Sequence, residues 1–104
     1  MIIGYTPTSH GNSALHGFHS LLLAAADQGR LHYGGQVRSG FSVLAKVDLA
    51  QRLARLRRSR PVVACPRQAL WVEPELYCRV QFQQRTAQGR LRGTCFRGLL
   101  GADT

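Results

Sequence analysis

Acidic side chains are scarce in this chain of 104 residues: five aspartates and glutamates stand against fourteen lysines and arginines, which leaves a formal net charge of +9. Lysine is nearly absent as well, since Lys46 is the only one and the other thirteen basic residues are arginine. A GC-rich genome explains arginine in place of lysine, but it does not explain the net excess. Because the planar guanidinium binds phosphate through two hydrogen bonds, the excess favours a nucleic-acid partner.

Long apolar runs are absent too, which excludes a transmembrane helix of about 18 or more consecutive apolar residues. The first residues, MIIGYTPTSHG, lack the basic start and the apolar stretch of a secretion signal. The cysteines are Cys65, Cys78 and Cys95, an odd number at spacings of 13 and 17 residues. Such spacing is a poor disulfide framework and is typical of a reducing compartment. We therefore expect a cytoplasmic protein with no membrane partner.

The remaining composition is that of a small globular domain. Apolar residues make up 44% of the chain, which is ordinary for a folded protein and argues against disorder. One hydrophobic core with a small stability margin is normal at this length. We expect residues 1–104 to form a single domain.

The first part of the chain has the pattern of β-structure. Residues 2–5, IIGY, predict a strand, and TPTSHGNS at 6–13 predicts a loop. The run FHSLLLAAAD at 18–27 fits a helix or a strand by periodicity alone. The AspGlnGly that ends it and the second run, RLHYGGQV at 30–37, favour a β-hairpin. Gly34 and Gly35 predict a bend or a bulge in the second strand.

One helix is predicted after the loop RSGFS at 38–42. The segment VDLAQRLARLRRS at 47–59 carries Leu49, Leu53 and Leu56 on one stripe. Ser42 or Asp48 is suited to cap its start. Arginines at 55, 57 and 58 are predicted to crowd its last turn, where cations suit the helix dipole. Prolines at 61 and 66 then end it.

The last forty residues again predict strands. After Pro74, the positions 76, 78, 80 and 82 (Leu, Cys, Val, Phe) point one way, and the residues between them point the other way. TAQG at 86–89 predicts a turn, and RLRGTCFRG at 90–98 predicts the partner strand. The chain is therefore predicted to be mainly β, with five strands and one α-helix between the third and fourth strands. This is the order of a five-stranded OB-fold barrel.

Three short motifs lie in this last region: Trp-Val-x-Pro-x-Leu at 71–76, Thr-x-x-Gly-x-Leu-Arg at 86–92 and Phe-x-Gly-Leu at 96–99. Upstream, IIGYT at 2–6, the hairpin segment at 21–37 and RSGFS at 38–42 follow in a compatible order. Together they resemble the C-terminal OB domain of bacterial ATP-dependent DNA ligases, in particular the ligase D type used in end joining. In the 38–42 loop, Ser39 stands where that family commonly has threonine.

The resemblance implies a division of labour. A separate nucleotidyltransferase domain, outside this chain, would carry the lysine that accepts AMP. The parent ligase would use ATP and Mg²⁺, whereas this domain alone would bind no cofactor and have no catalytic residue. The OB domain would close on the nucleotidyltransferase domain and grip nicked or broken duplex DNA during repair, as a monomer at the bacterial nucleoid.

Arginines of the last hairpin and of the 38–42 loop form the predicted DNA-binding surface, because guanidinium–phosphate contacts position a duplex without reading its sequence. The alternative is a solvated strand face, and Phe41 is equally compatible with a place in the core. The helix arginines (52, 55, 57, 58 and 60) are predicted to be a solvated helix face. The predicted DNA-binding residues are Arg38, Ser39, Phe41, Arg79, Arg85, Arg90, Arg92 and Arg97.

A metal site and a lysine nucleophile are both disfavoured. His16 and His19 are the only close pair among the four histidines, and no cysteine or carboxylate lies near them in sequence to complete a zinc site. Lys46 and Asp48 have the spacing of the ligase Lys-x-Asp-Gly motif, but Leu49 replaces its glycine. A small barrel also supplies no pocket that would lower the pKa of a lysine.

Two other functions remain open at this point. One is a protein-interaction module that docks on its catalytic domain through the basic face. The other is a single-strand-binding OB module, which needs several exposed aromatic residues.

The ligase family commonly continues Phe-x-Gly-Leu with Arg-x-Asp-Lys, whose basic groups orient the ATP pyrophosphate. Here LGADT follows Leu99, and Asp103 is the only trace of that motif.

Overall fold

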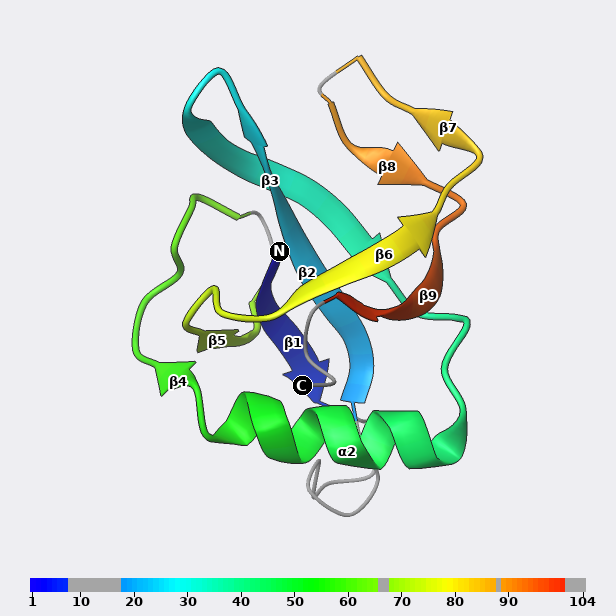
Figure 1. Cartoon of the computed structure of the whole chain (residues 1–104). Coiled ribbons are helices and arrows are strands. Elements are labelled where there is room, and N and C mark those ends of the chain that lie inside the picture. The colour runs from blue at the N-terminus through cyan, green and yellow to red at the C-terminus, as the bar shows by residue number, and fades with distance from the viewer. Residues whose placement is uncertain (8–17, 66–67, 88, 101–104) are drawn as a thin grey trace.

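The computed structural model describes residues 1–7, 18–65, 68–87 and 89–100. Its elements follow one another in the order β1 (Ile2–Pro7), β2 (Phe18–Asp27), β3 (Arg30–Val37), α2 (Val43–Ala54), β4 (Arg57–Arg58), β5 (Leu70–Val72), β6 (Tyr77–Gln81), β7 (Gln84–Arg85), β8 (Leu91–Arg92) and β9 (Cys95–Leu100). The described part of the protein is thus mainly β with one helix between the third and fourth strands, as predicted. In Figure 1, α2 crosses below the ends of β1 and β2.

The strands are grouped into one large sheet and two small ones. The large sheet has the order β3-β2-β1-β5-β4, whereas β6 pairs with β9 and β7 pairs with β8. Within the described ranges, these three sheets are not joined into one closed ladder, so the predicted five-stranded barrel is not confirmed. Single backbone bonds still connect them, for example from the Ile2 N–H to the Leu76 carbonyl at 2.9 Å.

The β2–β3 hairpin has the bounds that the sequence predicts. Its two-residue loop consists of Gln28 at φ 52° and Gly29 at φ 79°, and a type I′ turn requires positive φ at both positions. Further along, Leu23 pairs with Gly35 and the next residue, Ala24, pairs with Tyr33. One residue of β3 is therefore left over between them, which is the bulge expected at the glycine pair.

Of the two predicted caps the structure uses Ser42, and the helix ends earlier than predicted. Ser42 caps it by accepting the Ala45 N–H at 3.1 Å, and the helix ends at Ala54. Arg55 is the C-cap, and the following arginines at 57 and 58 form β4 against β5. The prediction of a helix over 47–59 with those arginines in its last turn is wrong, because pairing with β5 competes for the chain after Ala54. The leucine stripe is confirmed: Leu49 and Leu53 are buried, and Leu56 packs on the core beyond the helix end.

Strand β2 is buried on both faces, which explains its continuous apolar run. Leu21 and Leu23 face one core cluster, while Leu22 and Ala24 face another. The first cluster also contains buried residues of α2 together with Phe18 and Phe96. The second contains Ile3 and Tyr33, and Trp71 packs against it as a half-buried anchor.

Strand β6 alternates as the sequence predicts over most of its length. Cys78 and Val80 pack against the first core cluster, whereas the residues between them are exposed. The prediction fails at Phe82, which was expected to point the same way as Cys78 and Val80 but is 42% exposed. The reason is that β6 ends at Gln81, so the alternation no longer determines the direction of the next side chain. No helix in the described ranges is long and apolar enough to cross a bilayer.

Candidate nucleic-acid interface

A groove lies where the second half of β3 meets β8 and the turn that precedes it. Its volume is about 1160 Å³, and it is lined by Tyr33, Gly35, Gln36, Arg38, Ser39, Thr86, Arg90, Leu91, Arg92, Gly93 and Thr94. The two strands approach closely at Gly35, which has φ +116°. A Cβ atom there would lie 3.2 Å from the Leu91 carbonyl oxygen, so a side chain would push β8 away from β3.

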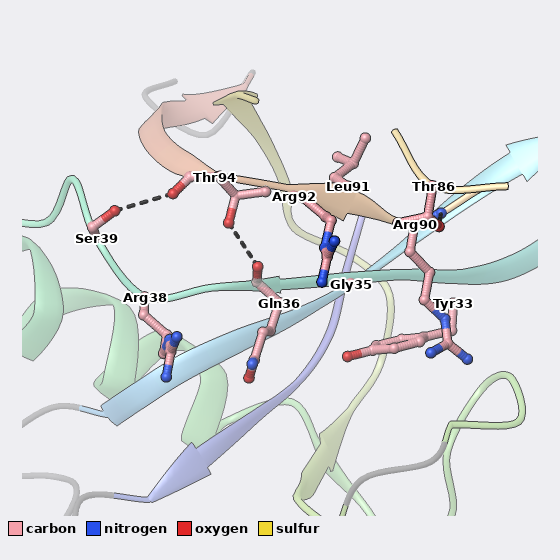
Figure 2. A pocket seen from close by; sticks show the side chains of 11 residues that line it. Tyr33, Gly35, Gln36, Arg38, Ser39, Thr86, Arg90, Leu91, Arg92 and Thr94 are labelled. Carbon is pink, nitrogen blue, oxygen red and sulfur yellow. Dashed lines mark hydrogen bonds between the residues drawn. The ribbon is translucent and has the colours of Figure 1, made fainter. Parts of the chain in front are cut away.

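Hydrogen bonds tie one end of the groove together, as Figure 2 shows. The Thr94 hydroxyl donates to the Gln36 carbonyl at 2.7 Å, and the Ser39 hydroxyl donates to the Thr94 carbonyl at 3.0 Å. The Phe96 N–H donates to the Ser39 carbonyl at 2.8 Å. The loop after β3 is therefore fixed to the chain between β8 and β9, although the two segments belong to different sheets.

The groove is positively charged. Arg38, Arg90 and Arg92 line it, and no acidic side chain is among the lining residues. The Arg90 guanidinium lies over the Tyr33 ring at 5.2 Å from its centroid, which holds the cation at the groove wall. Hydroxyl and amide groups of Ser39, Thr94 and Gln36 lie beside these cations. Cations and polar groups in one groove form a surface that suits phosphate oxygens.

The ion pairs in the described ranges lie on a different part of the molecule. Arg52 pairs with Asp48 at 3.0 Å within α2, and Arg58 pairs with Glu73 at 3.5 Å between β4 and the end of β5. Both pairs are partly exposed, so their contribution to stability is small. Their importance lies in their placement, because they reduce the charge of the helix side and leave the groove arginines unneutralised.

The structure separates the predicted DNA-binding residues into groups. It brings together Arg38, Ser39, Arg90 and Arg92 in the groove. Arg79 and Arg97 instead lie exposed on the small β6–β9 sheet, where Arg97 donates from Nε and Nη2 to the Oε1 of Gln81.

Arg85 and Phe41 lie apart from both groups. The guanidinium carbon of Arg85, on β7, lies 5.6 Å from the centroid of the Phe82 ring. Arg85 also borders a smaller cavity of about 330 Å³, which Cys78 lines as well. Burial raises the pKa of the Cys78 thiol, partly offset by the nearby N-terminal amine.

Phe41 is half-buried and packs against the first core cluster. Its ring stacks on Phe96 with 4.5 Å between centroids, and it meets Phe18 edge-on at 5.0 Å. Of the two roles that the sequence left open for Phe41, the structure supports packing. This aromatic cluster also carries Lys46, whose ammonium lies 5.7 Å from the Phe18 ring centroid.

Sequence reasoning missed several groove residues. Tyr33, Gln36 and Thr94 carried no signal of a site, because their chemistry is ordinary for strands and they gather only when β3 meets β8. Among the described residues, no group of three or more His, Cys, Asp or Glu side chains comes together, and we assign no metal to them. The pair His16 and His19 is not tested, since His16 lies outside the described residues, and so does Asp103.

Comparison with known proteins decides the family. Residues 15–100 match the family model described as the ATP dependent DNA ligase C terminal region. The chain belongs to this ligase family. The three motifs between Trp71 and Leu99 lie inside the matched range. The resemblance inferred from the residues is therefore confirmed.

This ligase C-terminal region also matches individual proteins. It is 30% identical over 105 residues to the multifunctional non-homologous end joining protein LigD of Pseudomonas aeruginosa, covering 95% of this chain and 12% of that one. The identity to LigD of Mycobacterium tuberculosis is also 30% over 105 residues, covering 95% of this chain and 14% of that protein. The chain therefore spans only a small part of these relatives.

Two solved structures share its fold. The crystal structure of the ligase domain of M. tuberculosis LigD aligns with a TM-score of 0.81 at 28% identity, covering 94% of this chain and 33% of that one. A mycobacterial DNA ligase D complexed with ATP and MES aligns with a TM-score of 0.73 at 29% identity, covering 94% and 32%. The ligase C-terminal region thus corresponds to about a third of each solved chain.

Proposed function

We propose that this ligase C-terminal region is a single OB-type domain that binds duplex DNA at nicks or breaks during end-joining repair. In this proposal the sugar–phosphate backbone lies in the groove between β3 and β8. The observation that carries the proposal is the convergence of Arg38, Arg90 and Arg92 in a groove with no acidic lining residue. Phosphate contacts of this kind are independent of sequence, which suits an enzyme that must act on any break.

The remaining basic residues are assigned a supporting part. Arg79, Arg85 and Arg97 are exposed on neighbouring strands, where they extend the positive field around the groove. Ser39 donates its hydroxyl proton to the Thr94 carbonyl, so its contact with a phosphate oxygen runs through a water that donates to the hydroxyl and to the phosphate. Phe41 has no direct part in DNA binding, since its ring is packed between Phe18 and Phe96.

Titration with a nicked duplex at several salt concentrations tests the proposal. We expect binding at low salt that weakens steeply as salt rises, with equal affinity for unrelated sequences. Arg92→Gln should weaken binding and reduce the slope of log K against log salt by about one unit. Arg52→Gln is the matched control, because it removes the same charge from a residue already paired with Asp48.

Two outcomes would contradict the proposal. One is the absence of binding to nicked duplex at low salt. The other is an equal loss of affinity in the Arg52→Gln and Arg92→Gln variants, because only net charge would then matter and the groove would have no special role.

A second candidate function is docking on the nucleotidyltransferase domain of the same ligase. The observation that favours it is an exposed apolar pair at the start of α2, where Val43 is 79% exposed and Leu44 is 82% exposed. Adjacent apolar side chains that are both this exposed are a feature of protein contact surfaces. Val43→Ser with Leu44→Ser should abolish association with the separately produced nucleotidyltransferase domain while leaving duplex binding intact. Unchanged association would remove this candidate.

ATP and Mg²⁺ belong to the parent ligase in this proposal. The described residues offer no cluster of carboxylates for a cation, and LGADT stands where the family has its basic Arg-x-Asp-Lys contact. We therefore assign no step of the ATP reaction to this domain. We also propose that the domain acts as a monomer at the cytoplasmic nucleoid, where the duplex DNA lies.

A further inference from the structure

A second group of arginines lies away from the groove. We name it the outer cluster and define it as Arg55, Arg57 and Arg60, all of which are exposed. Their neighbours Arg52 and Arg58 are paired with Asp48 and Glu73. None of the three forms an ion pair within the described ranges, so the outer cluster keeps its full positive charge.

The outer cluster stands on ordered backbone. Arg55 is the C-cap of α2, and its N–H donates to the Arg52 carbonyl at 3.3 Å. Arg57 lies in β4 opposite the fully buried Val72, and Pro61 restricts the backbone of Arg60. Between them, Leu56 packs on the core and its carbonyl accepts the Glu73 N–H at 2.8 Å. An ordered backbone lowers the entropy cost of presenting each of these cations to a partner.

Structural needs explain only part of this arrangement. A cation at a helix C-terminus stabilises the helix dipole, which accounts for Arg55. A charged residue on an edge strand discourages unwanted strand pairing, which accounts for Arg57. Neither reason applies to Arg60, and neither requires three unpaired cations within six residues.

The outer cluster and the groove lie at opposite edges of one sheet. The order β3-β2-β1-β5-β4 places β3, which borders the groove, at one edge and β4, which carries Arg57, at the other. Four strand spacings separate these edges, which corresponds to roughly 20 Å. Figure 1 shows β4 at the lower left and β8 at the upper right, with the sheet between them. A duplex that runs along β3 therefore does not reach the outer cluster, whereas one that runs across the sheet would, and capture of a second duplex separates these two cases.

We propose that the outer cluster binds the phosphate backbone of a second DNA duplex while the groove holds the first. Unpaired guanidinium groups on an exposed, ordered surface match a polyanion in charge and in hydrogen-bonding geometry. The domain thereby bridges two duplexes, which keeps two DNA segments close without a protein dimer. This inference rests on the proposed function only for the first duplex.

Capture of one duplex by another tests the inference. A biotinylated duplex is immobilised, loaded with the protein at low salt, and then offered a fluorescent duplex of unrelated sequence. We expect capture by the natural protein and a loss of about tenfold or more in the Arg55→Gln/Arg57→Gln/Arg60→Gln variant, since each lost phosphate contact weakens electrostatic binding. Affinity of that variant for the first duplex should stay unchanged, which also shows that it folds.

The matched control keeps the charge. Arg55→Lys/Arg57→Lys/Arg60→Lys should retain most of the capture, because three ammonium groups still meet the backbone. Undiminished capture in the glutamine variant would overturn the inference, and so would capture that appears only when sedimentation shows a protein dimer.

Other results separate this inference from the proposed function. If the natural protein binds no duplex at low salt, the proposed function itself fails. If it binds one duplex and never captures another, only the second site fails. If the glutamine variant captures normally but no longer associates with the nucleotidyltransferase domain, the outer cluster is a protein contact and the inference is wrong.

Discussion

The hydroxyl of Thr94 donates a 2.7 Å hydrogen bond to the backbone carbonyl of Gln36, which precedes it by 58 residues. This bond joins β3 of the large sheet to the chain between the two small sheets. The Ser39 hydroxyl adds a bond to the Thr94 carbonyl on the exposed side. The shape of the groove therefore depends on polar contacts between sheets, in addition to the strand ladders.

Thr94→Val should destabilise the fold by about 1–2 kcal/mol, because it removes a partly buried hydrogen bond and leaves the Gln36 carbonyl without that donor. Ser39→Ala removes a neighbouring bond that is exposed to water, so we expect a loss of at most about 0.5 kcal/mol. Urea denaturation of both variants measures the difference. Equal losses would mean that burial of the Thr94 bond has no effect.

Gly40→Ala should be among the most damaging single changes. Gly40 has φ +93°, and a Cβ atom there would lie 2.4 Å from the Phe96 carbonyl oxygen and 2.6 Å from its nitrogen. Relieving that clash separates the 38–42 loop from β9, so we expect a loss of about 3 kcal/mol or more in the free energy of unfolding. Gly29→Ala is the control, because Gly29 has a similar φ of +79° but open space around it. In Gly29→Ala, only the backbone strain of a positive φ should lower the free energy of unfolding, by about 1–2 kcal/mol. A larger loss in Gly29→Ala would contradict this account.

Phe41 substitutions distinguish packing from DNA contact. Phe41→Ala should cost about 3–5 kcal/mol, because its ring fills the space between Phe18 and Phe96. Phe41→Leu keeps most of that volume and should leave the affinity for nicked duplex unchanged. Fluorescence anisotropy on the folded leucine variant checks this result. Weakening comparable to that of Arg92→Gln would instead assign the ring a direct contact with DNA.

Cys78 should make the fold sensitive to alkaline pH. Burial raises the pKa of its thiol above the ordinary value of 9.0, so the folded protein holds the proton more tightly than the unfolded chain does. The stabilisation is complete below the pKa that the Cys78 thiol has in the unfolded chain. It is lost as the pH rises through the higher pKa of the thiol in the folded protein. The free energy of unfolding of Cys78→Ala should therefore decline less above that range. Cys65→Ala serves as the control, and an equally flattened profile in that variant would contradict the assignment.

Local sequence patterns predicted the hairpin well but placed the C-terminal end of the helix incorrectly. Asp27-Gln28-Gly29 between two β-type runs specifies a two-residue turn, so both strand bounds were correct. The leucine stripe and one of the two predicted caps, Ser42, are confirmed, but the helix ends at Ala54, where β4 begins to pair with β5. That end depends on pairing with residues 71 and 72, and no local propensity contains that information.

The candidate site was predictable in kind but not in arrangement. The excess of arginine indicated a phosphate partner, and four of the residues named from the sequence do meet in the groove. Their separation from Arg79 and Arg97 follows from which strand lies beside which, and this was not visible in the one-dimensional pattern. Tyr33 and Thr94 were missed because a ring that supports a guanidinium, or a hydroxyl that joins two sheets, has meaning only in the folded molecule.

Gly35 separates what sets the width of the groove from what sets its charge. The approach of β8 to β3 is set by a position without a side chain, where a Cβ atom would lie 3.2 Å from the Leu91 oxygen. The charges on the walls are carried by surface side chains that can be exchanged one at a time. The charge of the groove can therefore be changed at single surface positions while its width stays constant, whereas a side chain at Gly35 would move β8 away from β3 and shift all the groove residues on β8 together.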